Sequence, residues 1–298
     1  MTKISTCTRR TVKKIGVDAG MRMLAAAGYD ALDLSLDLYN DQLRDGTWRP
    51  IAAEYRALAN ELGVSFNQAH APFGGGLLPD GRSNYAVNLI PLIPAALEMA
   101  AAAGVETVVV HPFIGGVGGY LGREEEIFCE NMEFFGRLAP IARSLGVRVA
   151  IENLWVKSQT TESILNGPCA DPREHIRYID TLAAPDVFTL CLDLGHSALV
   201  GRNPASVIRT LGHDRLGALH VHDVDHKKDV HTLPYQSQLD WDSITAAHGE
   251  IDYQGYLTLE ADRFISTVPN ELLAHSTAYM AATARYLASR IDAARPEK

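Results

Sequence analysis

The chain has 298 residues, 47% of them hydrophobic and 21% charged, and its formal net charge is −9. This composition is typical of a globular protein that buries a substantial core, and the acidic excess weighs against nucleic acid as a partner. The cysteines form no C-x-x-C pair, the N-terminus lacks an apolar signal region, and no apolar run of membrane-span length is evident. These features predict a cytoplasmic protein with reduced thiols and no membrane partner.

Short apolar runs rich in β-branched residues alternate along the chain with longer segments of helical period. The short runs predict eight strands, at residues 3–7, 31–36, 64–69, 105–110, 147–151, 187–192, 216–221 and 256–259. The longer segments predict a helix after each strand, at residues 11–27, 50–62, 85–103, 123–145, 172–183, 204–211, 241–247 and 269–290. Such alternation is typical of βαβ units and of a parallel sheet.

Eight strand–helix pairs in strict order favour a single (β/α)8 TIM barrel domain over residues 1–298. An open, doubly wound parallel sheet is the alternative. The sequence contains no linker or low-complexity tract at which a second domain would begin. In a barrel the active site lies at the C-terminal ends of the strands, so the side chains that follow the predicted strands are the first candidates for a site.

Six of the eight predicted strands end in, or are followed at once by, a histidine or an acidic residue. Because parallel strands deliver these ends to one face, the side chains are expected to share one central volume. Crowded carboxylates repel one another, and a divalent cation resolves that conflict. The sequence therefore predicts one divalent metal on a mostly oxygen site, with Mn²⁺ favoured and Co²⁺, Mg²⁺ or Zn²⁺ as alternatives. The candidate side chains are His70, His111, Glu152, Asp193, His196, His220, His222 and Glu260.

Each of these side chains also has a structural interpretation when taken alone. His70 or His111 could make a structural hydrogen bond, Glu152 could cap the next segment, and Asp193 could be a turn residue. Their shared position at strand ends favours a common site over four separate explanations. Three other histidines fall on predicted helices or their ends and are assigned to surface or packing roles: His213, His248 and His275.

The chain resembles the xylose isomerase-like barrel superfamily in an ordered set of strings: VVVHPF, AIEN, LCLDLGH, HVHDVDHKKDVH and LTLEAD. That superfamily includes sugar and sugar phosphate isomerases and epimerases, inosose dehydratases and nucleases of the endonuclease IV type. The resemblance implies that one metal is held by Glu152, Asp193, His220 and Glu260.

Two histidines on the seventh predicted strand share one face. The family pattern His–apolar–x–Asp, completed by Asp223, favours His220 as the ligand and leaves His222 as its neighbour. Further residues are predicted to contact the substrate: His70, His111, Trp155, His196, His222, Asp229 and His231.

The resemblance implies a small-molecule keto-sugar or cyclitol substrate, and a proton abstracted next to a carbonyl to give a metal-stabilised enediolate. Glu152 and Glu260 are implied as the catalytic pair, one removing the proton and the other returning it. Isomerisation, epimerisation and an inosose-type dehydration share this first step, and the sequence leaves all three open. Dehydration would need a general acid, a role that His196 or His222 could fill. Barrels of this group often pair, so a homo-oligomer also stays open.

Two other functions are alternatives to the sugar enzyme. The nuclease branch of the superfamily uses three zinc ions, and its additional ligands would match His70, His111, Asp229 and His231; the acidic charge weighs against this branch. A barrel that retains the metal without catalysis, or as a subunit, is the third hypothesis. Ser158 stands where ketose 3-epimerases carry a second glutamate, which weighs against simple 3-epimerisation.

Two glycine-rich loops, at residues 73–78 and 113–120, follow strand ends and are predicted to cover the site. Trp155 could form an apolar wall against sugar carbons or pack in the core. Arg9 and Arg10 follow the first strand and could meet an anionic substrate group, although a solvated surface is the favoured interpretation.

Overall fold

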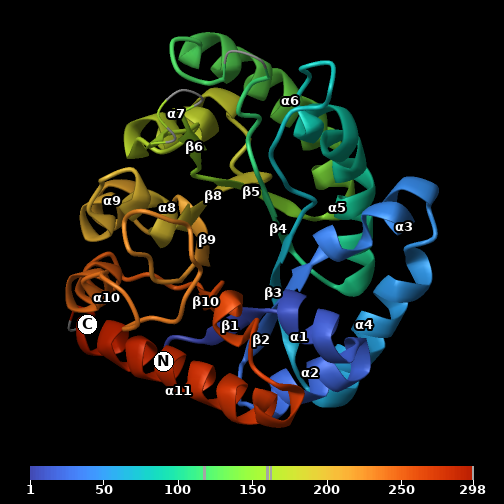
Figure 1. The fold of residues 1–298 in the computed structure, drawn as a ribbon, viewed down its shortest axis with the longest axis vertical. Helices are drawn as coiled ribbons and strands as arrows, with labels where there is room; N and C mark the ends of the chain where they lie inside the picture. The colour runs from blue at the N-terminus through green and yellow to red at the C-terminus, as the bar shows by residue number, and fades with distance from the viewer. Residues whose placement is uncertain (117–118, 159–160, 162, 297–298) are drawn as a thin grey trace.

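The computed structural model describes residues 1–116, 119–158, 161 and 163–296. Eight parallel strands form its central sheet, in the order β10-β1-β2-β3-β4-β5-β8-β9. A parallel bridge between Val221 and Leu259 joins the last strand to the first, so the sheet closes into a ring with helices around it (Figure 1). The predicted (β/α)8 barrel is therefore confirmed. Its strands are β1 (Ile4–Cys7), β2 (Ala31–Ser35), β3 (Ser65–His70), β4 (Thr107–Val110), β5 (Arg148–Glu152), β8 (Phe188–Asp193), β9 (Leu216–His220) and β10 (Leu257–Leu259).

The helices surround the sheet as the sequence periodicity predicts, with some additions. The α-helices are α1 (Arg9–Ile15), α2 (Val17–Ala26), α3 (Asn40–Asp45), α4 (Arg49–Leu62), α5 (Ile93–Ala103), α6 (Glu124–Leu145), α7 (Pro172–Leu182), α8 (Leu194–Leu199), α9 (Pro204–Leu211), α10 (Trp241–Glu250) and α11 (Leu273–Ala293). The shorter helical turns are η1 (Leu36–Tyr39), η2 (Tyr85–Leu89), η3 (Ile90–Leu92), η4 (Asp262–Ile265) and η5 (Asn270–Leu272).

Three features depart from the predicted elements. The helix predicted over 11–27 is broken at Gly16, whose backbone (φ 85°, ψ 170°) cannot continue a helix, and this gives α1 and α2. The short helix α8 follows β8 directly, with the Asp193 side chain accepting the His196 amide as its N-cap. An antiparallel hairpin of β6 (Trp155–Lys157) and β7 (Ile164–Asn166) follows β5 outside the barrel sheet.

One helical segment, Tyr85–Ala103, has the length and apolar composition of a membrane span. The expectation that the chain holds no such stretch is therefore wrong for this segment. Close to half of it is buried, and its α5 part contacts both α4 and α6. Burial between neighbouring helices accounts for this apolar composition without a membrane.

Strand alternation determines which side chains enter the barrel. Val108 and Val110 of β4 pack outward into the large core beneath the helices, whereas Val109 belongs to a separate inner cluster. The other members of that inner cluster lie on the next three strands: Ala150, Cys191 and Ala218. Each of these four apolar residues lies two positions before a candidate site residue. The candidates therefore form the next inward layer, at the C-terminal end of the barrel.

Candidate active site

Glu152, Asp193, His220 and Glu260 meet at this end of the barrel, with potential ligand atoms all within 4.8 Å of one another. His220 Nδ1 lies 3.1 Å from Glu152 Oε1, 3.3 Å from Glu260 Oε2 and 3.9 Å from Asp193 Oδ2. Strand ends made these four residues candidates, the family resemblance implied them as one set, and the structure brings the four side chains together. We call these four residues the central group.

The other ring nitrogen of His220 faces a buried carboxylate without a hydrogen bond to it. Its Nε2 lies 3.7 Å from Asp33 Oδ2, and Asp33 accepts a hydrogen bond of 3.1 Å from the Gln68 amide. Asp33 and Gln68 are buried inside the barrel, on β2 and β3. Sequence reasoning missed both residues. The signal was a single polar residue at an inward position of an apolar strand, as in ALDLS.

Glu152 extends the central group toward two more histidines. Its Oε2 lies 3.0 Å from His111 Nε2 and 3.3 Å from His70 Nε2. This oxygen is buried and has no hydrogen-bond partner among the residues that the structure describes. A buried carboxylate oxygen facing two imidazole nitrogens is a donor set that suits a cation.

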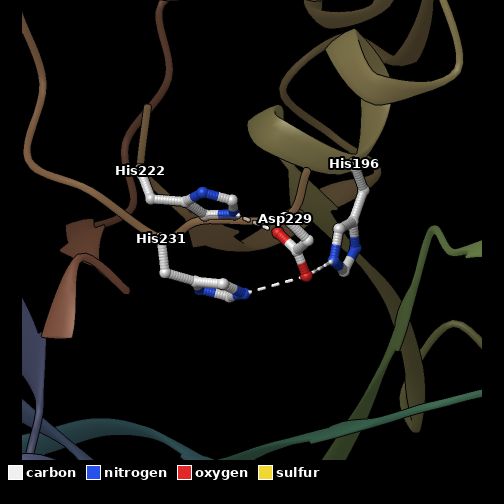
Figure 2. Close-up of side chains that lie close together, drawn as sticks. All are labelled: His196, His222, Asp229 and His231. Atoms are coloured by element: carbon white, nitrogen blue, oxygen red, sulfur yellow. Dashed lines mark hydrogen bonds and ion pairs between the residues drawn. The ribbon is translucent and has the colours of Figure 1, made fainter. Parts of the chain in front are cut away.

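His196, His222, Asp229 and His231 form a further set of neighbouring donors, which we call the lateral group (Figure 2). Asp229 Oδ2 lies 3.1 Å from His231 Nε2 and 3.5 Å from His196 Nε2, and Asp229 Oδ1 lies 4.0 Å from His222 Nε2. The His222 and His231 rings are stacked, with centroids 4.0 Å apart. Three imidazoles and one carboxylate form a nitrogen-rich set, which differs from the oxygen-rich central group.

Backbone carbonyls orient three of the imidazoles. The Nδ1–H group of His70 donates to Ala71 O (2.8 Å), that of His196 to Asn153 O (2.9 Å) and that of His231 to Glu260 O (3.0 Å). Because each Nδ1 is engaged, each Nε2 is directed toward a carboxylate. This arrangement is the usual one for histidines that bind metals.

Three of the four carboxylates in the two groups are held in their charged form. Burial alone would raise the pKa of Glu152, but His220 and His111 hold it well below its usual value. Burial also opposes ionisation of Asp193, but His196 and His222 lower its pKa to about 2. For Asp229, hydrogen bonds from His196 and from His231 outweigh burial and lower the pKa.

The imidazoles supply the compensating positive charge. Burial would lower the pKa of His196, but Asp193 and Asp229 raise it well above its usual value. The pKa of His231 is raised to about 9 against burial, chiefly by Glu260 and Asp229. Glu260 differs from the other carboxylates, because burial raises its pKa despite the nearby imidazoles. Clusters of this kind are typical of metal and catalytic sites.

Asn153 and Asp223 support the site without facing the cavity. Asn153 pairs with the Asp193 backbone, donating to its carbonyl (3.0 Å) and accepting from its amide (2.7 Å). Asp223 is fully buried and accepts from the Trp241 indole (3.0 Å) and from four backbone amides. Asp223, which the family pattern placed next to the ligand histidine, therefore fixes the long loop that carries Asp229 and His231.

A cavity of about 1000 Å³ opens above these groups. Asp193, His220 and His222 lie fully buried below it and do not line it. The site residues that face the cavity are His70, His111, Glu152, Trp155, His196, Asp229, His231 and Glu260.

The two glycine-rich loops line the cavity as well. Residues 73–77 of the first loop, and residues 114–116, 119 and 120 of the second, face it, while positions 117 and 118 lie outside the described residues. Ser158 also faces the cavity. Of the histidines assigned to surface or packing roles, His213 and His275 are exposed and His248 is buried.

Comparisons with known proteins agree with this architecture. A family model described as "Xylose isomerase-like TIM barrel" matches residues 21–287. An uncharacterised protein, y4fM, of Sinorhizobium fredii (strain NBRC 101917 / NGR234) is 31% identical over 179 residues, which are 59% of this chain and 54% of that protein. The chain thus matches about half the length of this curated relative.

Solved structures share the fold at low sequence identity. A D-tagatose 3-epimerase-like protein superposes with a TM-score of 0.72 at 18% identity, covering 98% of each chain. D-Psicose 3-epimerase from Clostridium cellulolyticum H10, solved with D-tagatose, gives 0.71 at 15% identity, covering 96% of this chain and 99% of that one. The IOLI protein, solved with a zinc atom, gives 0.68 at 17% identity, covering 99% of this chain and all of that one.

Proposed function

We propose that this chain, which belongs to the xylose isomerase-like TIM barrel family, is a divalent-metal-dependent isomerase or epimerase of a keto-sugar or cyclitol. The observation that carries the proposal is the position of Glu152 and Glu260. Both come from the ends of barrel strands, both face the cavity, and both have an oxygen near His220 Nδ1, at 3.1 and 3.3 Å. A substrate in the cavity would therefore meet two carboxylates of one cation site.

The central group would hold the metal through Glu152, Asp193, His220 and Glu260. Three carboxylates and one imidazole suit Mn²⁺ best, with Co²⁺, Mg²⁺ and Zn²⁺ as alternatives. When bound, the cation supplies a Lewis acid that polarises the substrate carbonyl. Asp193 and His220, which lie below the cavity floor, serve as ligands and do not reach the substrate.

The proton transfer falls to the two carboxylates that face the cavity. One of Glu152 and Glu260 removes the proton from the carbon beside the carbonyl, and the other returns a proton to the neighbouring carbon or to the opposite face. Both carboxylates face the cavity, and the pair is proposed to share the roles of base and acid.

Dehydration of an inosose is the alternative outcome of the same proton abstraction. It needs an acid beside the leaving hydroxyl, and the two histidines named from sequence are not equivalent. His196 faces the cavity, and Asp193 and Asp229 raise its pKa against burial, whereas His222 is fully buried against Asp193. His196 is the residue proposed for this role. The other side chains that the sequence predicted as substrate contacts and that face the cavity are proposed in that role: His70, His111, Trp155, Asp229 and His231.

Solvent exchange tests the proposal directly. A panel of ketoses and inososes is incubated in deuterated water with the Mn²⁺-loaded protein, and loss of C–H signals next to the carbonyl is followed by NMR. Exchange is expected to stop with a chelator, and to fall by about 10²–10⁴-fold in Glu152→Gln and Glu260→Gln. Glu130→Gln on α6, an exposed position, is the matched control. No exchange with any member of the panel would overturn the proposal.

An abasic-site nuclease is a second candidate, favoured by one specific observation. Glu152 belongs both to the central group and to a set with His70 and His111, and the His222–Asp193 contact of 3.1 Å joins the lateral group to the central group. These neighbouring sets include the additional positions that the nuclease branch implies: His70, His111, Asp229 and His231. This candidate requires three zinc ions per chain and nicking of abasic duplex DNA. Metal analysis that gives one ion per chain, together with intact DNA, would remove it. A barrel that binds metal without turnover is the remaining alternative, and activity on either substrate class excludes it.

A further inference from the structure

Three arginines stand at the mouth of the cavity, above the carboxylates and imidazoles of its floor. Arg9 and Arg10 begin α1 directly after β1, and Arg263 lies on η4 shortly after β10; all three line the cavity. Because β1 and β10 are neighbours in the sheet, the three cations come from one side of the mouth. Arg9 and Arg10, for which the sequence favoured a solvated surface, line the cavity with side chains that are 38% and 34% exposed.

We propose that Arg9, Arg10 and Arg263 form a subsite for an anionic group, a phosphate or a carboxylate, at the end of the substrate away from its carbonyl. This inference rests on the proposed function, because it names the class of keto-sugar that the site would take. Guanidinium groups recognise phosphate and carboxylate oxygens through paired, charge-assisted hydrogen bonds.

Arg9 has donors left for such a group. Its Nη2 pairs with Asp37 Oδ2 at 2.9 Å, and the guanidinium stacks on the Phe73 ring at 4.9 Å. A guanidinium carries five N–H donors, so one ion pair leaves most of them available. The Asp37 side chain is 6% exposed and fixes the position of the guanidinium, while the Arg9 side chain is 38% exposed.

The Phe73 ring lies between the arginines at the mouth and the imidazoles of the floor. Its centroid lies 4.5 Å from that of His70 and 5.1 Å from that of His111, and the Arg9 guanidinium lies on the same ring. One aromatic ring therefore separates the cation at the mouth from the imidazoles beside Glu152. A short sugar chain that placed its carbonyl over Glu152 would bring its far end to the arginines.

Arg10 and Arg263 are incompletely paired. The Arg10 Nε is buried without a hydrogen-bond partner, and its nearest carboxylate oxygen, Asp262 Oδ2, lies 3.5 Å away. Arg263 is exposed, and no ion pair joins it to another residue in the described part of the chain. The Arg10 side chain as a whole is 34% exposed and lines the cavity, so the outer part of its guanidinium can meet an anion there.

The charges at the mouth favour an anion even though the protein as a whole carries −9. Asp37 and Asp262 compensate two of the three arginines, which leaves Arg263 in excess. The acidic groups of the floor that also face the cavity, namely Glu152, Asp229 and Glu260, are each flanked by imidazoles. An anion at the mouth would therefore meet net positive charge.

Three hexoses that differ only at carbon 6 test the inference: D-tagatose, D-tagatose 6-phosphate and D-tagaturonate. Titration calorimetry with the Mn²⁺-loaded protein gives the affinity for each without requiring turnover. At least one charged sugar is expected to bind about tenfold or more tightly than D-tagatose, and the comparison of the two identifies phosphate or carboxylate as the ligand. Arg9→Met, Arg10→Met and Arg263→Met are each expected to reduce that affinity about tenfold or more, the lower range for a charge-assisted hydrogen bond.

Lys13→Met is the matched control, because Lys13 is an exposed cation on the same helix outside the cavity. It should leave all three affinities unchanged. Arg10→Met removes a partly buried group and could disturb the fold. Arg263 is exposed, so Arg263→Met is expected to keep the fold and still tests the subsite. Any of three results would overturn the inference. The neutral and charged sugars could bind equally, neither charged sugar could bind, or Lys13→Met and Arg263→Met could have equal effects.

Deuterium exchange on the same samples separates the two proposals. Exchange with D-tagatose, without tighter binding of a charged sugar, would sink the anion subsite and leave the proposed function intact. Arginine-dependent binding of a charged sugar, without exchange of any sugar in the ketose and inosose panel, would support the subsite and sink the proposed chemistry.

Discussion

The Nε2 atom of His222 lies 3.1 Å from both carboxylate oxygens of Asp193. Asp193 belongs to the central group and His222 to the lateral group, so this contact joins the two sets of donors. Both side chains are fully buried below the cavity floor. A change in either residue is therefore expected to reach both groups without altering the surface that a substrate touches.

Gly195→Ala is expected to break this contact. An added Cβ at position 195 would overlap the His222 ring, with the nearest ring nitrogen at 2.6 Å, so the imidazole would have to leave Asp193. We expect the Kd for Mn²⁺ to rise about 10–100-fold, as for loss of a residue that orients a metal ligand. Titration calorimetry measures this change.

Gly136→Ala on α6 is the control for that substitution. No atom lies within 4 Å of the added Cβ, and the position is exposed. This variant should gain about 0.5–1 kcal/mol of stability from the helix propensity of alanine and keep its metal affinity. Equal metal affinities in Gly195→Ala and Gly136→Ala would contradict the proposed role of the His222–Asp193 contact.

Metal binding is expected to raise the melting temperature. The buried carboxylates of the central group are arranged in the folded state alone, so a ligand that binds there stabilises by about 2.7 kcal/mol at a free concentration 100 times its Kd. For a chain of this size such a gain corresponds to a rise of several degrees in Tm. Differential scanning fluorimetry with Mn²⁺, and then with excess chelator, measures the gain and its reversal.

Asp193→Asn should remove most of this Tm gain, because it deletes a charged donor at the centre of the group. Asp186→Asn, an exposed position paired with Arg143, should retain it. If the wild-type Tm does not respond to Mn²⁺, Co²⁺, Mg²⁺ or Zn²⁺, the central group does not bind a divalent cation.

Asp223→Ala is expected to destabilise the protein strongly. The carboxylate is fully buried and accepts hydrogen bonds from the Trp241 indole and from the backbone amides of Ser237, Gln238 and Leu239, in addition to Val224. Loss of a buried charged acceptor leaves several donors unpaired, at about 2–4 kcal/mol in the free energy of unfolding. Urea denaturation measures the loss. Asp225→Ala in the same loop, at a partly exposed position where the carboxylate accepts from two backbone amides, should cost less.

His248 is expected to make stability depend on pH. It is buried on α10, its Nδ1–H donates to Ile244 O at 3.0 Å, and burial lowers its pKa from 6.5 to about 4. Between these two values the unfolded chain binds a proton that the folded protein does not. Its stabilising contribution is therefore fully present above about pH 6.5 and is lost as the pH falls toward 4, with a total of about 3 kcal/mol.

His248→Gln tests this dependence, because glutamine does not titrate. The free energy of unfolding, measured by urea denaturation at pH 7, 6 and 5, should fall less steeply for the variant than for the wild type. His213→Gln, which changes an exposed histidine, should leave the slope unchanged. Parallel slopes for wild type and His248→Gln would contradict the prediction.

The barrel and its site-bearing edge could be predicted from sequence because both depend on local periodicity. Strand ends at His70, Glu152, Asp193 and His220, and a strand that ends just before Glu260, follow from short apolar runs that stop at a polar residue. In a parallel barrel those ends must meet, and the family resemblance then selected the four residues of the central group without knowledge of the loops.

The rest depends on contacts between residues far apart in the chain. The convergence of His196 with Asp229 and His231 requires a loop whose course is fixed by Asp223 and backbone amides, and no repeat in the sequence encodes it. The helix α8 was missed because it is short and buried along its whole length, so it shows no amphipathic period. The role of Gly195 likewise depends on a distant residue, because only the approach of His222 explains why a side chain cannot stand there.

The ring of parallel strands closes through the Val221–Leu259 bridge, with the Val221 amide donating to Thr258 O (2.9 Å) and the Glu260 amide donating to Val221 O (3.0 Å). Val221 follows His220 and Leu259 precedes Glu260, so this seam lies directly beside two of the proposed ligands. A cation bound by both His220 and Glu260 would link the ends of β9 and β10, the junction of the barrel that a single bridge joins, and would stabilise it against local opening. Amide hydrogen exchange in β10 should consequently slow on metal loading far more than exchange in β4, which pairs with β5 along its whole length and with β3 at Val108 and Val109.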